Sequence, residues 1–545
     1  MKYSFKLTTS MEKVFFDDFS LIPELKNATM FKNEIYSFQL AARYEADSEI
    51  HEYVTVEIDS PIKNYVKINR QGYVAATMPR AIGWCDDDYL FTSPSVVPDP
   101  LFPTDGSDCE IFNSQTRTFW LSVEPNGNVY GKYPIKVIVK TEKGDVIGDV
   151  SFELEIFDAL LPEQKLINSC WFHGDCLASL HNTEVFSDEY WELTDKYMQI
   201  YRKFGHNMIL TPVVTPPLDT KIGGERPTNQ LIDVYVNKGI YSFNFDKLEK
   251  FIKLAKKNDI NYFEIAHLFT QWGAKFTPKI MAYVDGEYKK IFGWEVESLS
   301  AEYMAFIKAF VPALIEELKK YGIYENCRFH ISDEPTPEHK EQYLAAKDLI
   351  SEFVSEDQLM DALASYEFYK DGIVKHPIVS NDHIGKFLDE GATDISTYYC
   401  VCQGDKVANR FMAMPSYRNR VLGIQLYKNN IIGFLQWGFN FWYSKLSKTV
   451  IDPYMTNDSS GFVSGDGFVV YPVDSKGNVV ISSRLYVFNE AIQDLRALQL
   501  LESLTNRDYV ISLLDDFVQF TDYPRDNGYY IEFREKLNNE IIKHL

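Results

Sequence analysis

The chain has 545 residues, of which 45% are hydrophobic and 24% charged, a composition typical of a globular protein large enough for several domains. The 55 basic and 78 acidic residues give a formal net charge of −23. Because this negative field repels phosphate backbones and anionic lipid headgroups, we expect neither a nucleic-acid partner nor a membrane partner.

The first residues and the cysteines indicate the compartment. Residues 1–19 are interrupted by charges and contain no apolar run of signal-peptide length. Seven cysteines, spread thinly over a long chain, are typical of reduced thiols rather than of a disulfide framework. The closest cysteines are Cys170 with Cys176 and Cys400 with Cys402, and neither pair has zinc-site spacing. The sequence therefore predicts a cytoplasmic protein with no metal and no cofactor.

Residues 1–163 are predicted to form a β-sandwich. Apolar and polar residues alternate there in short runs separated by turn residues, which is typical of strands buried on one face. The clearest runs are residues 53–58, 117–123, 133–139 and 150–156. No helical stretch separates these runs, so two packed sheets are expected. The segment 93–108, rich in proline and aspartate, is predicted to be a long loop that reaches a neighbouring domain.

Residues 164–505 are predicted to form an α/β domain, a (β/α)₈ TIM barrel. Apolar runs alternate there with stretches of helical spacing, as expected for parallel strands joined by helices. Eight candidate strands lie at residues 167–172, 208–214, 262–269, 328–332, 360–366, 395–401, 421–427 and 431–439. A doubly wound open sheet is the alternative, but no G-x-G-x-x-G follows the first strand. Residues 506–545 are predicted to form a helical extension packed on the barrel.

The fourth predicted strand is followed by two adjacent carboxylates, Asp333 and Glu334. In a barrel, active sites form on the loops that follow the strands. Thr336 can cap the next helix, and Pro335 is expected to keep Glu334 extended at the rim. Adjacent carboxylates repel each other, which raises the pKa of one of them and makes an acid–base pair. The alternative is that both residues only favour the positive end of the following helix.

A second, separate carboxylate is missing where many barrel glycosidases have one. A retaining enzyme of the ordinary type needs a nucleophile about 5–5.5 Å from its acid. No Asp or Glu occurs between residues 406 and 451, which include the last two predicted strands. Either Glu367, after the fifth strand, is the partner, or Asp333 and Glu334 act together on a substrate that supplies its own nucleophile. A 2-acetamido group can do this through its carbonyl oxygen.

Aromatic and amide side chains also follow the predicted strands. Aromatic rings pack against the apolar faces of sugars, and amide or imidazole groups bind sugar hydroxyls. Each ring alone is equally compatible with core packing, but their repetition at one end of the barrel favours a sugar site. The candidate substrate-binding residues are His267, Trp272, Tyr398, Trp437 and Asn440. No second histidine lies at ligand spacing from His267, so a metal is not expected there.

Several motifs, in this order and spacing, resemble those of glycoside hydrolase family 123 and of the broader, uncharacterised domain family that shares its catalytic region. They are His-Ile-Ser-Asp-Glu-Pro at 330–335, Gly-Phe-Leu-Gln-Trp-Gly at 433–438, Gly-Asp-Gly-Phe-Val-Val-Tyr-Pro at 465–472, and Ser-Arg-Leu at 483–485 leading into Gln-Asp-Leu at 493–495. The resemblance, with the preceding sandwich, covers most of the chain.

The resemblance implies an exo-acting β-N-acetylgalactosaminidase that works with retention through an oxazolinium intermediate. Carried over by motif, Asp333 would orient the acetamido group, Glu334 would be general acid and then general base, and Trp437 would contact the sugar. The expected partner is an oligosaccharide or glycoconjugate, and an imported oligosaccharide fits the absence of a signal peptide. Two alternatives stay open: a glycosidase of another specificity with Glu334 as acid and a separate carboxylate nucleophile, or a non-catalytic glycan-binding protein. The oligomeric state is not predicted.

Overall fold

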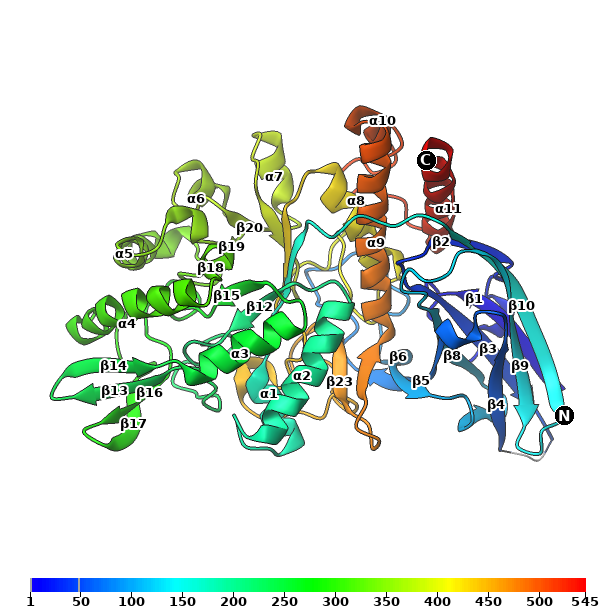
Figure 1. Cartoon of the computed structure of the whole chain (residues 1–545), viewed down its shortest axis with the longest axis horizontal. Helices are drawn as coiled ribbons and strands as arrows, with labels where there is room; N and C mark the ends of the chain where they lie inside the picture. Colours follow the sequence, from blue (N-terminus) through cyan, green and yellow to red (C-terminus); the bar gives the residue numbers. More distant parts are fainter. Residues whose placement is uncertain (1, 48–49) are drawn as a thin grey trace.

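The computed structural model describes residues 2–47 and 50–545 (Figure 1). Two mostly antiparallel sheets lie at one end of the molecule, and a parallel sheet with its helices occupies the middle (Figure 1). A separate four-stranded sheet stands at the opposite end. It has the order β14 (Ile240–Asn244), β13 (Asp233–Asn237), β16 (Ile280–Val284) and β17 (Glu287–Phe292).

The two N-terminal sheets pack their apolar residues against each other. Alternation is clear in β9, where Ile135, Val137 and Val139 are buried between more exposed neighbours. They join Phe38 and Leu121 of the facing sheet in one core cluster. The seven-stranded sheet has the order β1 (Lys2–Thr9), β3 (Tyr36–Glu45), β8 (Thr116–Val123), β5 (Val66–Ala76), β6 (Ser95–Thr104), β24 (Val479–Ser482), β23 (Val470–Val473). The five-stranded sheet has the order β2 (Asn27–Phe31), β10 (Val146–Phe157), β9 (Gly131–Thr141), β4 (His51–Asp59), β7 (Cys109–Phe112).

The predicted loop at 93–108 is wrong, because most of it is strand β6. Three prolines suggested a loop, since proline cannot donate to a strand ladder. In the structure β6 pairs with β5 through a bulge between Gln71 and Tyr73, and it meets β24 at only two positions. The segment does reach the later part of the chain: Asp99 of β6 accepts from the Arg484 side chain at 2.7 and 3.0 Å.

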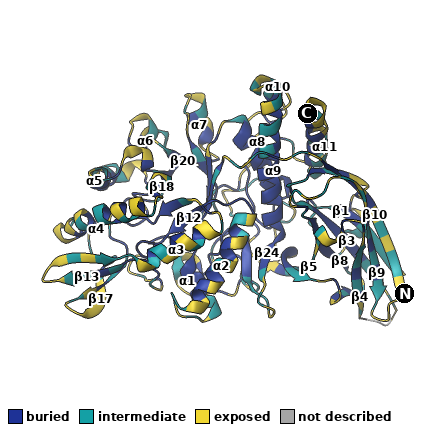
Figure 2. Ribbon diagram, in the orientation of Figure 1, coloured by how far each residue is buried: buried dark blue, intermediate teal, exposed yellow. Residues whose placement is uncertain are grey.

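The central sheet has eight parallel strands and is curled. Its order is β18 (Cys327–Phe329), β15 (Tyr262–Ile265), β12 (Met208–Thr211), β11 (Ile167–Cys170), β22 (Gly433–Gln436), β21 (Ser396–Tyr398), β20 (Pro377–Ser380), β19 (Asp361–Leu363). One further parallel bridge, between Phe329 and Leu359, joins β18 to the segment just before β19. The strands are short and largely buried, as Figure 2 shows for the middle of the molecule. The α/β class and the parallel sheet are therefore confirmed.

The helices up to residue 428 connect the parallel strands, and three further helices follow the last of these strands in the chain. They are α1 (Gly174–His181), α2 (Asp188–Lys203), α3 (Asp246–Lys257), α4 (Ala301–Lys320), α5 (Lys340–Ser351), α6 (Tyr366–Lys370), α7 (Ile384–Asp389), α8 (Tyr417–Lys428), α9 (Ser483–Leu504), α10 (Arg507–Ser512) and α11 (Asn527–His544). Helix α4 begins as its sequence predicts, because the Ser300 hydroxyl accepts from the Tyr303 N–H at 3.3 Å. Gly322 follows its end with φ 66°.

One predicted strand is a helix in the structure, and one strand of the parallel sheet was not predicted. Residues 421–427, predicted as the seventh strand, are helix α8. This helix is buried on all sides against α9 and α11, so it has no polar face to reveal a helical period. Gly423 allows the close crossing, since a Cβ there would lie 1.8 Å from the Ala491 carbonyl oxygen. Strand β20 was missed, because a four-residue strand that begins with proline carries little signal.

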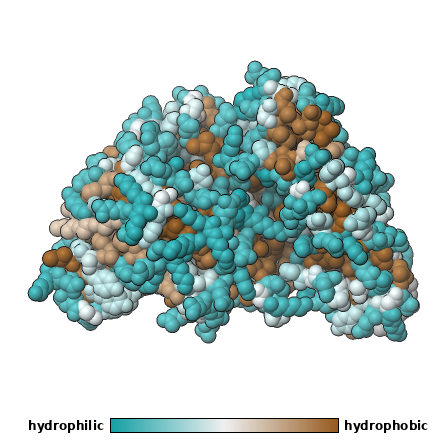
Figure 3. Space-filling view, in the orientation of Figure 1, coloured by the Kyte–Doolittle hydropathy of each residue, from teal (hydrophilic) through white to brown (hydrophobic). Residues whose placement is uncertain are grey.

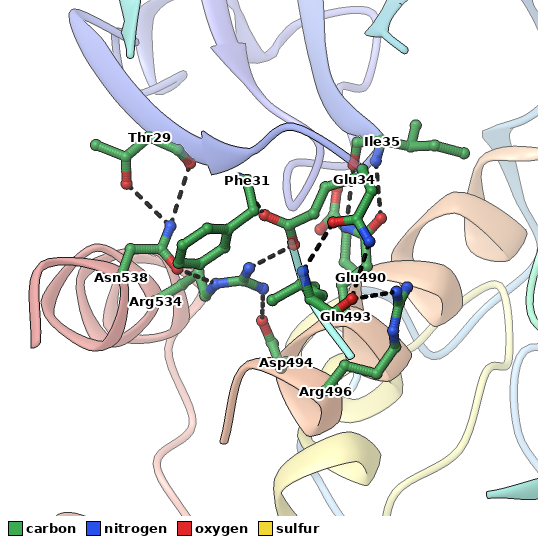
Figure 4. Close-up of polar contacts among 12 residues, drawn as sticks. Thr29, Phe31, Glu34, Ile35, Glu490, Gln493, Asp494, Arg496, Arg534 and Asn538 are labelled. Atoms are coloured by element: carbon green, nitrogen blue, oxygen red, sulfur yellow. Dashed lines mark hydrogen bonds and ion pairs between the residues drawn. The ribbon is translucent and has the colours of Figure 1, made fainter. Parts of the chain in front are cut away.

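A buried polar junction joins the N-terminal sheets to the C-terminal helices (Figure 4). Arg534 of α11 donates to Asp494 of α9 at 2.8 Å and also pairs with Glu34, which follows β2. The Glu34 carboxylate in turn accepts from the Phe31 N–H at 2.6 Å, and Asn538 donates to the Thr29 hydroxyl at 2.9 Å. Because these charges are buried and paired, the junction fixes β2, α9 and α11 to one another.

The visible surface is mostly hydrophilic (Figure 3). On the face drawn in Figure 3, hydrophilic side chains cover most of the molecule, and apolar ones gather in small patches, one of them near the C-terminal helices. None of the helices in the described ranges combines the length and the apolar character needed to cross a membrane.

Candidate active site

A cavity of about 260 Å³ lies at the carboxyl ends of the parallel strands. Its walls come from the segments that follow several of these strands, as the parallel arrangement requires. The residues that follow or end five of them are Trp171 (β11), Gln271 (β15), Glu334 (β18), Tyr398 (β21) and Trp437 (β22). The cavity therefore gathers side chains that are far apart in the sequence.

Asp333 and Glu334 lie side by side in this cavity, on the loop between β18 and α5. The main chain holds them from both sides: the Trp272 N–H donates to the Asp333 carbonyl at 2.9 Å, and the Glu334 N–H donates to the Ala362 carbonyl at 3.1 Å. Glu334 has φ 45°, so it is left-handed rather than extended. This conformation costs a non-glycine residue about 1 kcal/mol, which the hydrogen bonds to the neighbouring loops offset.

The surroundings of the pair favour protonation. Burial, followed by the charge of Glu334, raises the pKa of Asp333 well above its usual value. Burial also raises the pKa of Glu334, although the Tyr398 hydroxyl donates to its Oε1 at 2.5 Å and opposes the shift. Two adjacent carboxyl groups with raised pKa values do not both ionise readily, so the pair can hold one proton near neutral pH. This is the state that an acid and a neighbouring carboxylate require.

A buried cation lies beneath the pair. The His330 ring contacts Glu264 at 2.6 Å and Asp361 at 3.2 Å. Burial opposes a charge on the ring, but the hydrogen bonds to Asp361 and Glu264 outweigh it and raise the pKa of His330 to about 10. The positive charge of the His330 imidazolium favours the ionised form of Asp333, which lies three residues later in the chain.

His267 does not line the cavity, contrary to the prediction. It is fully buried, its ring stacks on His330 at 4.2 Å, and neither ring nitrogen has a hydrogen-bond partner among the described residues. Within the described ranges, His267, His330 and Asp361 form the one group whose ligand atoms approach closely enough for a metal ion. A histidine nitrogen binds a metal ion that lies in the plane of its ring, and two stacked rings have no such position in common. In addition, both His330 nitrogens already have carboxylate partners. We therefore assign no ion to this group.

Of the other four residues predicted to bind substrate, three line the cavity and one does not. Trp272, Tyr398 and Trp437 line the cavity. Asn440 is fully buried behind it: its side chain accepts from the His173 N–H at 2.8 Å and donates to the His173 carbonyl at 3.0 Å. Asn440 thus fixes the segment after β11 rather than facing a sugar, because both ends of its amide are already used by the main chain.

Two carboxylates of the cavity were missed by sequence reasoning. Burial raises the pKa of Asp466 to about 7, and its Oδ2 accepts from the Trp437 indole N–H at 3.1 Å. Burial raises the pKa of Asp219 to about 6, and it accepts from the Leu446 N–H at 2.8 Å. Asp466 lies in the Gly-Asp-Gly motif noted above, but it follows no strand of the parallel sheet. Glu367, the partner considered from the sequence, is exposed on α6 and does not line the cavity.

Comparison with known families identifies this arrangement. The sequence model for "Glycoside hydrolase 123, catalytic domain" matches residues 171–501, more than half of the chain. The chain belongs to glycoside hydrolase family 123. The match contains the whole loop with Asp333 and Glu334, together with the motifs around Trp437 and Asp466. The family expected from the sequence motifs is thus confirmed.

A solved structure shares the fold of this chain. A family 123 glycoside hydrolase from Clostridium perfringens, described in connection with glycolipid glycan hydrolysis, matches with a TM-score of 0.78 at 14% identity, covering 99% of both chains. At this identity the match shows a shared fold. A β-glucuronidase from Parabacteroides merdae matches with a TM-score of only 0.31 and 10% identity, over 89% of this chain and 52% of that one. None of the curated protein sequences matches this chain.

Proposed function

We propose that this family 123 glycoside hydrolase removes terminal β-linked N-acetylhexosamine, preferably N-acetylgalactosamine, from an oligosaccharide or glycoconjugate by substrate-assisted retaining catalysis. The observation that carries the proposal is the adjacency of Asp333 and Glu334 in an aromatic-walled cavity, with Tyr398 bonded to Glu334. The galacto preference rests on the motif resemblance, and the glycolipid glycan hydrolysis described for the Clostridium perfringens enzyme supports a glycoconjugate substrate.

Each residue has a distinct task in this mechanism. Asp333 accepts the acetamido N–H and turns the carbonyl oxygen towards the anomeric carbon. That oxygen attacks the carbon while Glu334 gives its proton to the glycosidic oxygen, so the leaving group departs as an alcohol and an oxazolinium ion remains. Glu334, now a carboxylate, then takes a proton from water, which opens the ring at the anomeric carbon and gives the product with retained configuration. The raised pKa of Glu334 suits the first of these roles.

A separate carboxylate nucleophile is the alternative, and Asp219 and Asp466 are its candidates because both line the cavity. Each is less suited to the role than the acetamido group. Asp466 already accepts the Trp437 indole N–H, and with a pKa of about 7 a large fraction of it is protonated at neutral pH. A protonated carboxyl group is a poor nucleophile. Asp219 is likewise held by the Leu446 N–H.

The fold supports the proposal at the level of architecture. Read around the sheet from β11, the strands follow one another in chain order, and the bridge between Phe329 and Leu359 joins β18 to the segment before β19. We infer a (β/α)₈ barrel over residues 164–505, preceded by a sandwich of residues 1–163 and followed by a helical extension of residues 506–545. In such a barrel the carboxyl ends of the strands are the usual place for a catalytic site.

The test compares four chromogenic β-glycosides: the N-acetylgalactosaminide, the N-acetylglucosaminide, the galactoside and the glucoside. Hydrolysis confined to the acetamido sugars, with inhibition by a thiazoline analogue of the oxazolinium ion, supports the proposal. Glu334→Gln should lose about 10²–10⁴-fold on leaving groups that need a proton, and Asp333→Asn should lose activity on all leaving groups. Glu367→Gln, an exposed carboxylate outside the cavity, is the matched control and should stay active.

The other outcomes identify the alternatives. Hydrolysis of the plain galactoside or glucoside would show that the acetamido group is not the nucleophile, and a 2-fluoro sugar should then become trapped on Asp219 or Asp466. Glycan binding without hydrolysis of any of the four substrates would favour the non-catalytic alternative.

A further inference from the structure

A loop from the N-terminal sheets reaches the cavity. The loop runs from the end of β5 at Ala76 to the start of β6 at Ser95. Its residue Trp84 lines the same cavity as Glu334. The Trp84 side chain is 54% exposed. Single exposed aliphatic residues are common on protein surfaces and need no explanation. An exposed indole that lines a cavity, by contrast, is a candidate for contact with a ligand.

The loop is held against the central domain by several specific contacts. Cys85 pairs with Gly404 in a parallel bridge, and the Tyr89 hydroxyl donates to the Gly404 carbonyl at 2.9 Å. Asp86 accepts from the fully buried Arg418 at 2.9 Å. A Cβ at Gly404 would lie 2.2 Å from the Trp84 carbonyl oxygen, so the approach requires glycine. The main chain at Trp84 is therefore held in position before any ligand arrives.

A second exposed indole, Trp272, lines the cavity next to the catalytic pair. It is 45% exposed, has φ 59°, and donates its backbone N–H to the Asp333 carbonyl. The left-handed backbone costs a residue of this size about 1 kcal/mol or more. Neither Trp84 nor Trp272 has a ring partner among the described residues, although rings are packed densely elsewhere in the chain. Both indoles are thus partly exposed and are not packed on another ring of the described residues.

The rings of the cavity are graded by depth. Trp171 and Tyr398 are buried, and Tyr398 touches Glu334, so they belong to the closed end where the terminal sugar would lie. Trp84 and Trp272 stand at the solvent end. The leaving group of an exo-acting enzyme lies on the solvent side of the acid that protonates it, so the rim rings face the leaving group rather than the terminal sugar.

We propose that Trp84 and Trp272 form a leaving-group subsite, in which the pyranose ring next to the terminal hexosamine packs against the indoles. This rests on the proposed function and adds that the substrate is an oligosaccharide whose penultimate unit is recognised. The N-terminal sheets then contribute directly to specificity through Trp84. Aromatic faces favour the apolar side of a sugar ring, so the penultimate sugar is expected to present such a face to the indoles.

The test separates this subsite from the hydrolytic step. A disaccharide, β-N-acetylgalactosaminyl-galactose, has a leaving ring, whereas β-N-acetylgalactosaminyl azide has none. Trp84→Ala should lose about tenfold in kcat/KM on the disaccharide and stay within about twofold on the azide, and Trp272→Ala should lose at least as much as Trp84→Ala on the disaccharide. Trp84→Phe keeps a flat ring and should recover most of the loss. Ile82→Ala, on the same loop, 93% exposed and outside the cavity lining, is the matched control and should change neither substrate.

Each other result has one meaning. Equal losses of Trp84→Ala on both substrates, with unchanged thermal unfolding, would overturn the subsite and leave the proposed hydrolysis standing. Loss of disaccharide activity in Ile82→Ala as well would place the effect in the loop conformation and would also overturn it. Inactivity of the unmodified protein on both substrates would overturn the proposed function, and the subsite with it.

Discussion

Replacing Tyr398 by phenylalanine removes a single hydroxyl group from the cavity and leaves its aromatic ring in place. That hydroxyl donates to Glu334 Oε1 at 2.5 Å, and it stabilises the carboxylate form of Glu334 relative to the acid form. The substitution therefore tests the proton equilibrium of the proposed acid without changing the acid itself.

The magnitude follows from the charge on the acceptor. A hydrogen bond to an ionised group contributes about 1.5–3 kcal/mol, and 1.36 kcal/mol corresponds to a tenfold change in a proton equilibrium. The lower end of this range already corresponds to a change of about tenfold. Its sign is fixed: without the donor the carboxylate is less stable, so the pKa of Glu334 rises further and the acid form persists to higher pH.

The assay is the pH profile of kcat/KM on a substrate whose leaving group needs a proton. The alkaline limb should move to higher pH in Tyr398→Phe, and Glu334→Gln should lose that limb. Tyr399→Phe is the matched control, because Tyr399 is the next residue, is buried, and its hydroxyl has no hydrogen-bond partner among the described residues. An alkaline limb that stays in place or moves to lower pH in Tyr398→Phe would refute the assignment of Glu334 as the acid.

Three further predictions concern buried charges. His330, with a folded pKa of about 10 against 6.5 for the free group, contributes stability that is complete below pH 6.5 and is lost as the pH rises towards 10; His330→Gln should therefore flatten the decline in urea-unfolding free energy between pH 6.5 and 9. Asp466→Asn should keep at least about a tenth of kcat on an aryl N-acetylgalactosaminide, because a lost nucleophile would cost far more. Arg534→Met leaves the buried Glu34 without a charged partner, whereas Asp494 keeps Arg420, and it should lower the unfolding free energy by about 3–5 kcal/mol, measured by urea titration.

Elements with a clear local period were predictable, and those defined by long-range packing were not. The runs at 133–139 and 262–269 correspond to β9 and β15 because alternation and a buried apolar run survive in the sequence. Helix α8 was mistaken for a strand because burial on every side erased its polar face. Strand β6 was read as a loop because it contains three prolines, and proline cannot donate to a strand ladder.

The same distinction applies to the candidate site. Asp333 and Glu334 could be located because they follow a strand directly, and the loop's proline and threonine mark where the next helix begins. Trp84 and Asp466 lie outside the strand–helix repeats, so no local pattern places them at the carboxyl ends of the strands. His267 and Asn440 follow strands correctly, but their neighbours enclose them, and burial of a particular polar side chain is not visible in its sequence context.

One sheet explains why these two distant segments meet in the cavity. In the order β5, β6, β24, β23, the Trp84 loop joins the first two strands, and Asp466 lies just before the last. Arg484 links β6 to the segment that contains Asp466. Its guanidinium donates to Asp99 of β6 and, at 2.6 Å, to the Gly465 carbonyl beside Asp466. Removal of residues 1–163 would therefore leave Arg484 without its carboxylate, expose the edge of β24 and delete Trp84. The segment that matches the family model thus contains the acid, but the cavity around it is completed by the N-terminal sheets.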